Sequence, residues 1–226
     1  MPVAGVDDIG ITRCPDCHVS LADQEVVSEH FTCCAHNGAQ GYLLAHNAVT
    51  KELAGIFRDA GYVDIRYERR GLVAGSQRRP GDVSAREPSG GELLVVDATV
   101  GYTASKTGAR EAAQTAGAAA LSAEAAKVRN APSLGPGVRF VPFAVDDLGY
   151  VAPAAQSLLN ALASRAVRTG GLAAGEGDET AAKGRVLTAW RRRLSAAVHG
   201  SIARVVLRRT SRARHLGAPA DSALDL

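Results

Sequence analysis

The residues with the most specific chemistry are the cysteines and histidines near the start of the chain. All four cysteines fall between residues 14 and 34. The spacing Cys-x2-Cys-x12-His-x3-Cys matches a tetrahedral zinc site whose ligands would be Cys14, Cys17, His30 and Cys34. Cys33 and His36 are rival candidates for the fourth position. Clustered thiols in a chain without a signal peptide favour metal over disulfides, so we expect a closed structural zinc site.

Two aspartates in the middle of the chain form a second candidate site. Asp97 lies in "GELLVVDATVGY", whose apolar residues predict a buried strand, where an unpaired carboxylate is costly. Asp82 follows "RRPG" and lies on the preceding strand of an expected hairpin. A pair of carboxylates at one end of a sheet can hold Mg²⁺, and a nearby lysine, Lys106 or Lys127, would balance charge during phosphoryl chemistry. On pattern alone, two solvated hairpin ends remain the alternative interpretation.

The elements that must position these residues follow from periodicity and turn signals. Apolar residues at helical spacings predict helices, and alternating or continuous apolar runs predict strands. The predicted order is helix 42–60, strand 62–68, strand 81–85, strand 93–100, helix 107–129, strand 138–145 and helix 153–168. A helix, three strands, a helix and a strand predict an α/β fold with a mixed sheet between helices.

The flanking regions differ in composition from this middle part. We expect a leader at 1–13, a zinc knuckle at 14–41, an α/β domain at 42–168, a linker at 169–184, a basic amphipathic helix at 185–214 and a disordered tail at 215–226. Of the 26 basic residues 22 are arginines, which bind phosphate better than lysine does. On the basic helix, the expected phosphate contacts are Arg192, Arg193, Arg204 and Arg208. The alternative is an amphipathic helix that only packs on the sheet.

The chain shows no sign of a membrane segment or of secretion. No apolar run approaches the roughly 20 residues that a membrane helix needs. The first residues lack a basic segment followed by an apolar one, as a signal peptide would have. We therefore expect an intracellular protein that does not engage a membrane.

Taken in order, these features resemble the C-terminal region of the reverse-transcriptase polyproteins of non-LTR retroelements. In that region a CCHC zinc knuckle precedes a restriction-like endonuclease of the PD-(D/E)xK type. Beyond the cysteines, the matching stretches are Ala45-His46-Asn47, like the family's Arg-His-Asn at a helix start, "RRPGDV", "LLVVDATV", "EAAKVRN" and "VRFVPFAVDDLGYVAPAAQSLLNALA". The resemblance covers most of residues 14–210.

The resemblance implies a restriction-endonuclease-like core that nicks DNA with Mg²⁺, after a structural Zn site. Carried over by position, Asp82 and Asp97 would be the metal carboxylates and Lys127 the catalytic lysine. The implied partners are DNA, with RNA as the alternative, and a reverse transcriptase domain of the same polyprotein, and the implied location is nuclear. Two departures stand out: Ala98 and Thr99 follow Asp97, so the usual Asp-x-Lys is absent, and the chain has no Tyr-x-Asp-Asp polymerase motif. A catalytically inactive nucleic-acid-binding fragment is therefore the second hypothesis.

Overall fold

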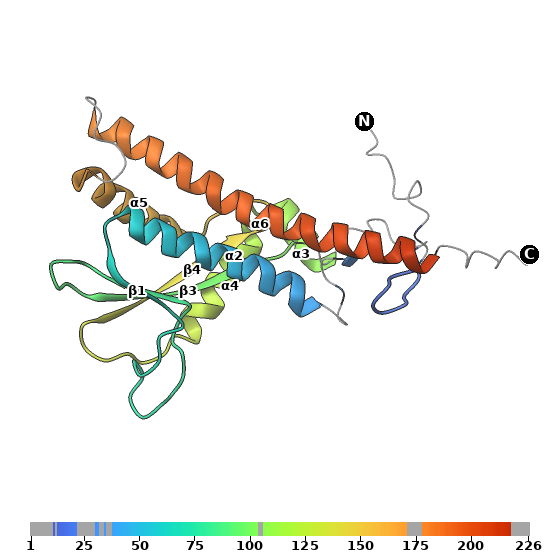
Figure 1. The fold of residues 1–226 in the computed structure, drawn as a ribbon, viewed down its shortest axis with the longest axis horizontal. Coiled ribbons are helices and arrows are strands. Elements are labelled where there is room, and N and C mark those ends of the chain that lie inside the picture. Colours follow the sequence, from blue (N-terminus) through green and yellow to red (C-terminus); the bar gives the residue numbers. More distant parts are fainter. Residues whose placement is uncertain are drawn as a thin grey trace, which may run out of the picture.

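The computed structural model describes residues 11, 13–21, 30, 31, 34, 38–103, 106–170 and 178–217. Most of the expected leader 1–13 lies outside these residues. In chain order the elements are α2 (Gly38–Asp59), β1 (Val63–Tyr67), β2 (Val83–Arg86), β3 (Leu93–Gly101), α3 (Lys106–Gln114), α4 (Ala118–Arg129), β4 (Val138–Asp146), α5 (Pro153–Arg168) and α6 (Glu179–Gly217). Figure 1 shows α6 running along the length of the molecule, beside α2. The mixed α/β fold expected from the sequence is confirmed.

The strands form one mixed sheet of four strands in the order β1-β2-β3-β4. β1 pairs antiparallel with β2, and β2 pairs antiparallel with β3. β3 and β4 are parallel, in register from Leu93 opposite Val138 to Gly101 opposite Asp146. The expected hairpin of the second and third strands is therefore present, and β3, which carries Asp97, lies inside the sheet.

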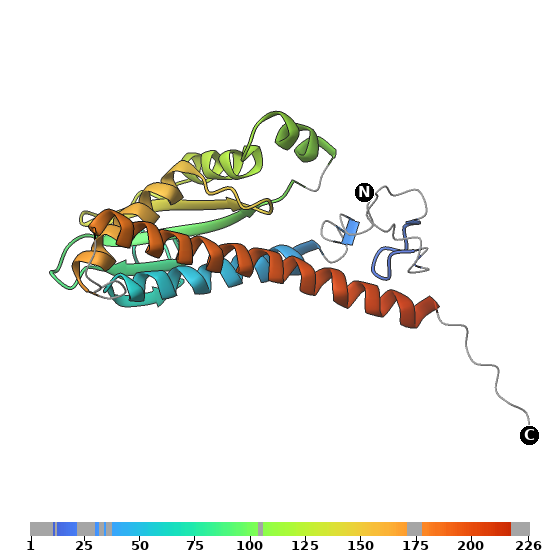
Figure 2. The ribbon, with the colours of Figure 1, turned by 90° about the horizontal axis from the view of Figure 1, so that it is seen from above.

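The two faces of the sheet are covered by different helices, and alternation along β3 decides which side chain meets which layer. Leu94, Val96 and Ala98 are buried in the main core with residues of α2, α5 and α6. Asp97 therefore belongs to the opposite face, where α4 lies across β3 and β4 (Figure 2). The apolar cluster on the α4 side is small and is built around Ala120, Ala144 and Ala152.

The single helix predicted over 107–129 is two helices, α3 and α4. The break comes at Gly117, whose φ of 76° lies in the left-handed region. A Cβ at this position would come within 2.2 Å of the ring of Tyr150, so residue 117 cannot carry a side chain here. The chain turns at this glycine, and α4 then carries Lys127 to Asp97 on the face of the sheet that α4 covers.

The C-terminal helix is longer than the predicted 185–214. α6 begins at Glu179 because Asp178 Oδ1 accepts a hydrogen bond of 3.0 Å from the backbone N–H of Thr180, as a helix N-cap does. Residues 179–184 are therefore helical instead of part of the expected linker 169–184. At the other end α6 reaches Gly217, inside the expected tail 215–226. The remaining linker residues 171–177 and tail residues 218–226 lie outside the described residues.

α6 contributes directly to the core. Trp190, Leu194 and Val198 are buried against the helices and the sheet, as expected for an amphipathic helix. The indole Nε1 of Trp190 also donates a hydrogen bond of 3.2 Å to Asp59 Oδ2 at the end of α2. Although α6 is long, its many charges set it apart from a membrane helix. In the described part of the chain, no helix combines the length and apolarity needed to cross a bilayer.

Candidate metal centre and candidate active site

The cysteine–histidine cluster starts with a hydrogen-bonded turn over residues 14–19. The backbone N–H of Cys14 donates to the carbonyl of Val19, and that of His18 donates to the carbonyl of Cys14, both at 3.0 Å. His18 takes a left-handed φ of 59°, which lets the chain reverse after Cys17. This short turn brings the first two thiols to the same centre.

The ligand atoms of the predicted zinc set all lie within 4.8 Å of one another, and they belong to Cys14, Cys17, His30 and Cys34. The Sγ atoms of Cys14 and Cys34 are 3.8 Å apart, and Cys17 Sγ lies 3.3 Å from His30 Nε2. Tetrahedral zinc with bonds of about 2.3 Å to sulfur separates its sulfur ligands by about 3.8 Å. The cluster therefore fits a metal ion such as zinc. The rival ligands Cys33 and His36 lie outside the described residues.

Burial is the largest cause of the pKa shifts of Cys14 and His30 in this cluster. Burial raises the pKa of the Cys14 thiol to about 11. Burial, followed by the positive charge of Arg209, lowers the pKa of His30 and favours its neutral form, which is the form that binds metals. A cation at the centre would stabilise the thiolates, so metal binding here is expected to release protons.

The metal-binding turn is docked onto the C-terminal part of α6 by a buried ion pair. Asp16, between the first two cysteines, has a side chain only 4% exposed. Its Oδ2 lies 3.1 Å from Arg209 Nε, and its Oδ1 lies 3.0 Å from Arg212 Nη1. The buried apolar residues of the cluster, Leu21 and Phe31, are joined by Val206 of the same helix. α6 therefore connects the metal centre to the α/β core.

The second candidate site is assembled from distant parts of the chain. Asp82 lies directly before β2, and its backbone N–H donates to the carbonyl of Val96 on β3 at 2.8 Å. Such close approach requires the glycine at position 81, since a Cβ on Gly81 would come within 2.8 Å of the Val96 carbonyl oxygen. Asp97 follows on β3, on the face that α4 covers. The carboxyl groups of Asp82 and Asp97 therefore come within hydrogen-bonding reach of each other.

Asp82 is held by two donors on one carboxylate oxygen. Its Oδ2 accepts hydrogen bonds from His46 Nε2 at 3.0 Å and from the backbone N–H of Ala98 at 2.7 Å. Burial opposes ionisation, but the hydrogen bond and charge of His46, together with the Ala98 N–H, hold the pKa of Asp82 below its usual value. Asp82 is therefore a fixed carboxylate at neutral pH.

Asp97 has the opposite electrostatic balance. Burial raises its pKa, and the nearby Asp82 adds to that rise, although Lys127 Nζ lies 2.8 Å from Asp97 Oδ2 and acts against it. Two neighbouring carboxyl groups whose pKa values are pushed apart are typical of proton- or cation-binding sites. The structure thus brings together the three residues that the resemblance pointed to, while their catalytic roles stay predictions. The side chain of the rival Lys106 lies outside the described residues.

His46 is a member of this site that the sequence did not single out as functional. Its Nε2 contacts Asp82, and its Nδ1 lies 3.3 Å from Asn47 Oδ1, so both ring nitrogens face oxygen atoms. The hydrogen bond to Asp82 raises the pKa of His46 despite its burial, which favours the doubly protonated ring. The available signal was the stretch Ala45-His46-Asn47. Because α2 begins at Gly38, His46 lies inside the helix instead of at its start.

A cavity of about 360 Å³ opens beside the carboxylate–lysine cluster. One wall comes from α4 and the segment after it, and the other from the end of the β1–β2 loop. Its polar lining residues are Arg78, Arg79, Asp97, Thr99, Lys127 and Asn130. The arginines, Lys127, the Asn130 amide and the Thr99 hydroxyl are all hydrogen-bond donors. They outnumber the single carboxylate of Asp97, so the cavity suits an anionic ligand whose oxygen atoms accept hydrogen bonds.

The arginines expected to bind nucleic acid on α6 have different surroundings. Arg192, Arg204 and Arg208 are exposed. Arg193 is neutralised, because its Nε lies 2.8 Å from Glu52 Oε2 and its Nη1 lies 2.6 Å from Asp59 Oδ2. Arg193 therefore holds α6 against α2, and a phosphate at this position would have to compete with both carboxylates.

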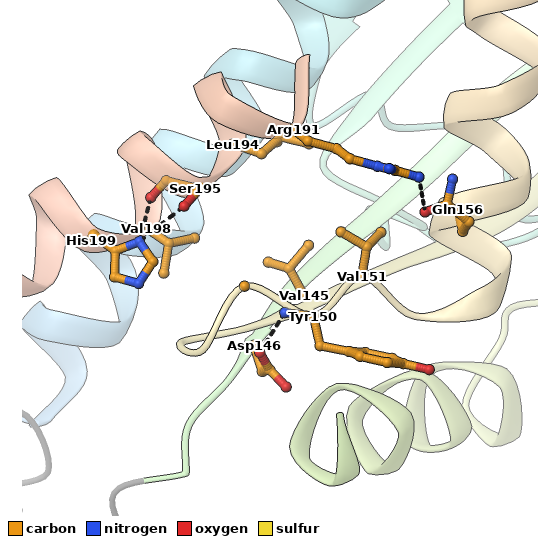
Figure 3. Close-up of a pocket in the computed structure, with 11 residues that line it drawn as sticks. Val145, Asp146, Tyr150, Val151, Gln156, Arg191, Leu194, Ser195, Val198 and His199 are labelled. Atoms are coloured by element: carbon orange, nitrogen blue, oxygen red, sulfur yellow. Dashed lines mark hydrogen bonds between the residues drawn. The ribbon is translucent and has the colours of Figure 1, made fainter. Parts of the chain in front are cut away.

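A second cavity, of about 340 Å³, lies between the end of β4 and α6 (Figure 3). Arg191 donates a hydrogen bond of 2.8 Å to Gln156 at its rim, and Asp146 accepts from the backbone N–H groups of Leu148 and Tyr150. Its apolar side chains are Val145, Val151, Leu194 and Val198. The described residues that line it include no lysine and no second carboxylate. The carboxylate–lysine pair of Asp97 and Lys127 lines the first cavity.

Comparison of the chain with known protein families and with curated proteins found no match. The functional interpretation therefore rests on the geometry of the metal centre and of the carboxylate–lysine cluster.

Proposed function

We propose that this chain is a metal-dependent DNA endonuclease module that nicks a strand by hydrolysing a phosphodiester bond. The observation that carries the proposal is the meeting of Asp82, Asp97 and Lys127, which come from three separate elements, beside a polar cavity. Paired carboxylates with a cationic side chain supply the charge balance that phosphodiester hydrolysis needs.

The two carboxylates fit a magnesium ion. Mg²⁺ prefers oxygen ligands and usually takes only one or two protein carboxylates, leaving the other positions to water and phosphate. Asp82 and Asp97 would hold it, and the repulsion between them would be offset by its charge. When bound, Mg²⁺ would neutralise charge on the scissile phosphate and lower the pKa of an attacking water.

The remaining residues of the site orient and balance these groups. His46 and the Ala98 N–H fix the Asp82 carboxylate, so its position does not depend on a ligand. Lys127 would stabilise the negative charge that builds on the phosphate oxygens. In the family that the chain resembles, the lysine usually follows the second carboxylate on the same strand. Here Lys127 reaches the carboxylate of Asp97 from α4 and would take the place of the lysine that is missing from the strand.

The wider context follows from the same resemblance. A zinc-binding module before a nuclease-like core supports a retroelement origin, with a reverse transcriptase domain as the functional partner. In that context the enzyme would nick chromosomal DNA in the nucleus and so provide a primer end. The exposed arginines of α6, Arg192, Arg204 and Arg208, would add affinity for DNA phosphates that does not depend on sequence.

The test is relaxation of supercoiled plasmid by the zinc-loaded chain with Mg²⁺. We expect Asp97→Asn to abolish nicking and Lys127→Met to slow it by about 100-fold or more. The matched control is Glu92→Gln, which removes an exposed carboxylate that pairs with Arg139 at the start of the sheet. Nicking by Asp97→Asn at the wild-type rate would refute the site. A wild-type chain that binds DNA but never nicks it would favour the non-enzymatic nucleic-acid-binding fragment.

A further inference from the structure

We infer that the β1–β2 loop, residues 68–82, is the platform on which the DNA strand lies, and that Arg78 and Arg79 hold a phosphate next to the scissile one. This inference rests on the proposed function, because it takes the cavity beside Asp97 and Lys127 as the place of cleavage. The sequence had placed all phosphate contacts on the basic helix. The structure brings a different set of arginines to the candidate active site.

The base of the loop is fixed against the sheet. The backbone N–H of Glu68 donates to the carbonyl of Asp82 at 2.9 Å, and the N–H of Asp82 donates to Val96 on β3 at 2.8 Å. Pro80 and Gly81 are buried between these points. The two residues before Pro80 therefore stand at a set place relative to Asp97. They line the cavity without any movement of the loop.

The charges of the loop are only partly neutralised. Arg69 pairs with Asp64, and Arg79 pairs with Glu68. Arg70 and Arg78 are exposed and have no carboxylate partner among the described residues. Glu68 is exposed, so the phosphates of a bound DNA strand would replace it as the partner of Arg79. The loop can therefore present both Arg78 and Arg79 to phosphate.

The opposite wall of the cavity completes an anion site. Lys127 and Asn130 lie at the end of α4, across the cavity from the arginines, with Asp97 between the walls. A strand that crosses the cavity can place one phosphate between the carboxylates and Lys127 and the next on the loop. α6 packs on the other face of the sheet (Figure 2), so its arginines do not line this cavity.

The test measures binding of a labelled DNA duplex by fluorescence anisotropy, without magnesium so that nothing is cut, and without chelator so that zinc stays bound. The test variant is Arg78→Gln with Arg79→Gln. Each neutralised phosphate contributes about 0.9 to the slope of log affinity against log salt, so we expect the loss of this one contact to lower the slope by about 0.9. The matched control is Arg58→Gln with Arg168→Gln, which removes two exposed arginines at the opposite end of the sheet.

The outcomes separate this inference from its alternatives. A smaller salt slope for the loop variant and an unchanged slope for the control support it. Equal slopes for the loop variant and the wild type overturn it, as does an equal fall in the control, which would mean that only net charge matters. Competition experiments with RNA and with inorganic phosphate show which phosphate-bearing ligand the loop prefers. Stronger competition by RNA of the same length, or by inorganic phosphate at micromolar concentration, would overturn the assignment to DNA.

Because binding is measured without cleavage, failures of the two proposals can be told apart. A chain that nicks plasmid but shows no effect of the loop variant overturns this inference alone. A chain that binds DNA through the loop but never nicks it overturns the proposed function alone.

Discussion

The metal centre and the carboxylate–lysine site gather reactive side chains in different ways. The metal centre takes all its ligands from residues 14–34, and one hydrogen-bonded turn orients the first two thiols. The carboxylate–lysine site takes residues from α2, the start of β2, β3 and α4, and none of them is close in sequence to its partners. Ligand spacing can therefore encode the first site, whereas the second exists only when the sheet has formed.

The two sites also depend differently on a cation. In the metal centre, burial raises the pKa of the Cys14 thiol, so a bound cation would be needed to stabilise its thiolate. The other site has internal partners for its carboxylates, since His46 contacts Asp82 and Lys127 pairs with Asp97. We therefore expect the loss of metal to unfold the first region and to leave the second folded.

Removal of zinc should have the largest effect. Structural zinc contributes on the order of 10 kcal/mol to folding of its module, because the unfolded chain has no preformed site. We expect about one zinc per chain, and on chelation a loss of hydrogen-exchange protection at residues 13–21 and in α6 beyond Val205. The sheet and α2 should keep their protection. Loss of protection across the whole chain would contradict the independence of the two regions.

Substitution of Asp82 should destabilise the fold when magnesium is absent, whereas substitution of Asp97 should not. Asp82→Ala leaves the Ala98 N–H and His46 without their acceptor, so we expect a loss of about 1–3 kcal/mol. Asp97→Ala removes a group whose pKa is raised, and at pH 7 its charged form opposes folding. Its melting temperature should stay unchanged or rise. Thermal unfolding at pH 7 measures both, and a larger loss for Asp97→Ala would show that its main role is structural.

A smaller effect should link α6 to the metal centre. Arg209, nearly buried, holds Asp16 within the metal-binding turn, and its charge acts on His30. Outer groups that orient metal ligands typically change metal affinity by 10-fold or more, about 1.4 kcal/mol. We expect this loss for Arg209→Met in competition with a chelator, and recovery of part of it in Arg209→Lys.

Arg212→Met is the matched control, because Arg212 contacts the same aspartate but is 63% exposed. An equal loss of zinc affinity in both variants would mean that Asp16 needs only positive charge nearby. If Arg209→Met lowers the stability of α6 but leaves the zinc affinity unchanged, Arg209 only docks the metal-binding turn on α6 and does not tune the metal centre.

The sequence by itself determined what local patterns encode. Spacing predicted Cys14, Cys17, His30 and Cys34 as metal ligands but left Cys33 and His36 as rivals for the fourth position. The bounds of α5 agree with the predicted 153–168, a helix that has a proline at its first turn. The succession of strands along the chain and the pairing of β2 with β3 also follow from alternation and turn residues. These features depend on residues within a few turns or strands of each other.

Tertiary structure decided the rest, because contacts between distant residues leave no local pattern. The break at Gly117 depends on the ring of Tyr150, which comes from the loop after β4. The contact between His46 and Asp82 requires α2 to lie along the sheet, and the pairing of Arg193 with Glu52 and Asp59 requires α6 to return over α2. Packing of separate elements thus determined which charged side chains were neutralised and which were left facing the cavity.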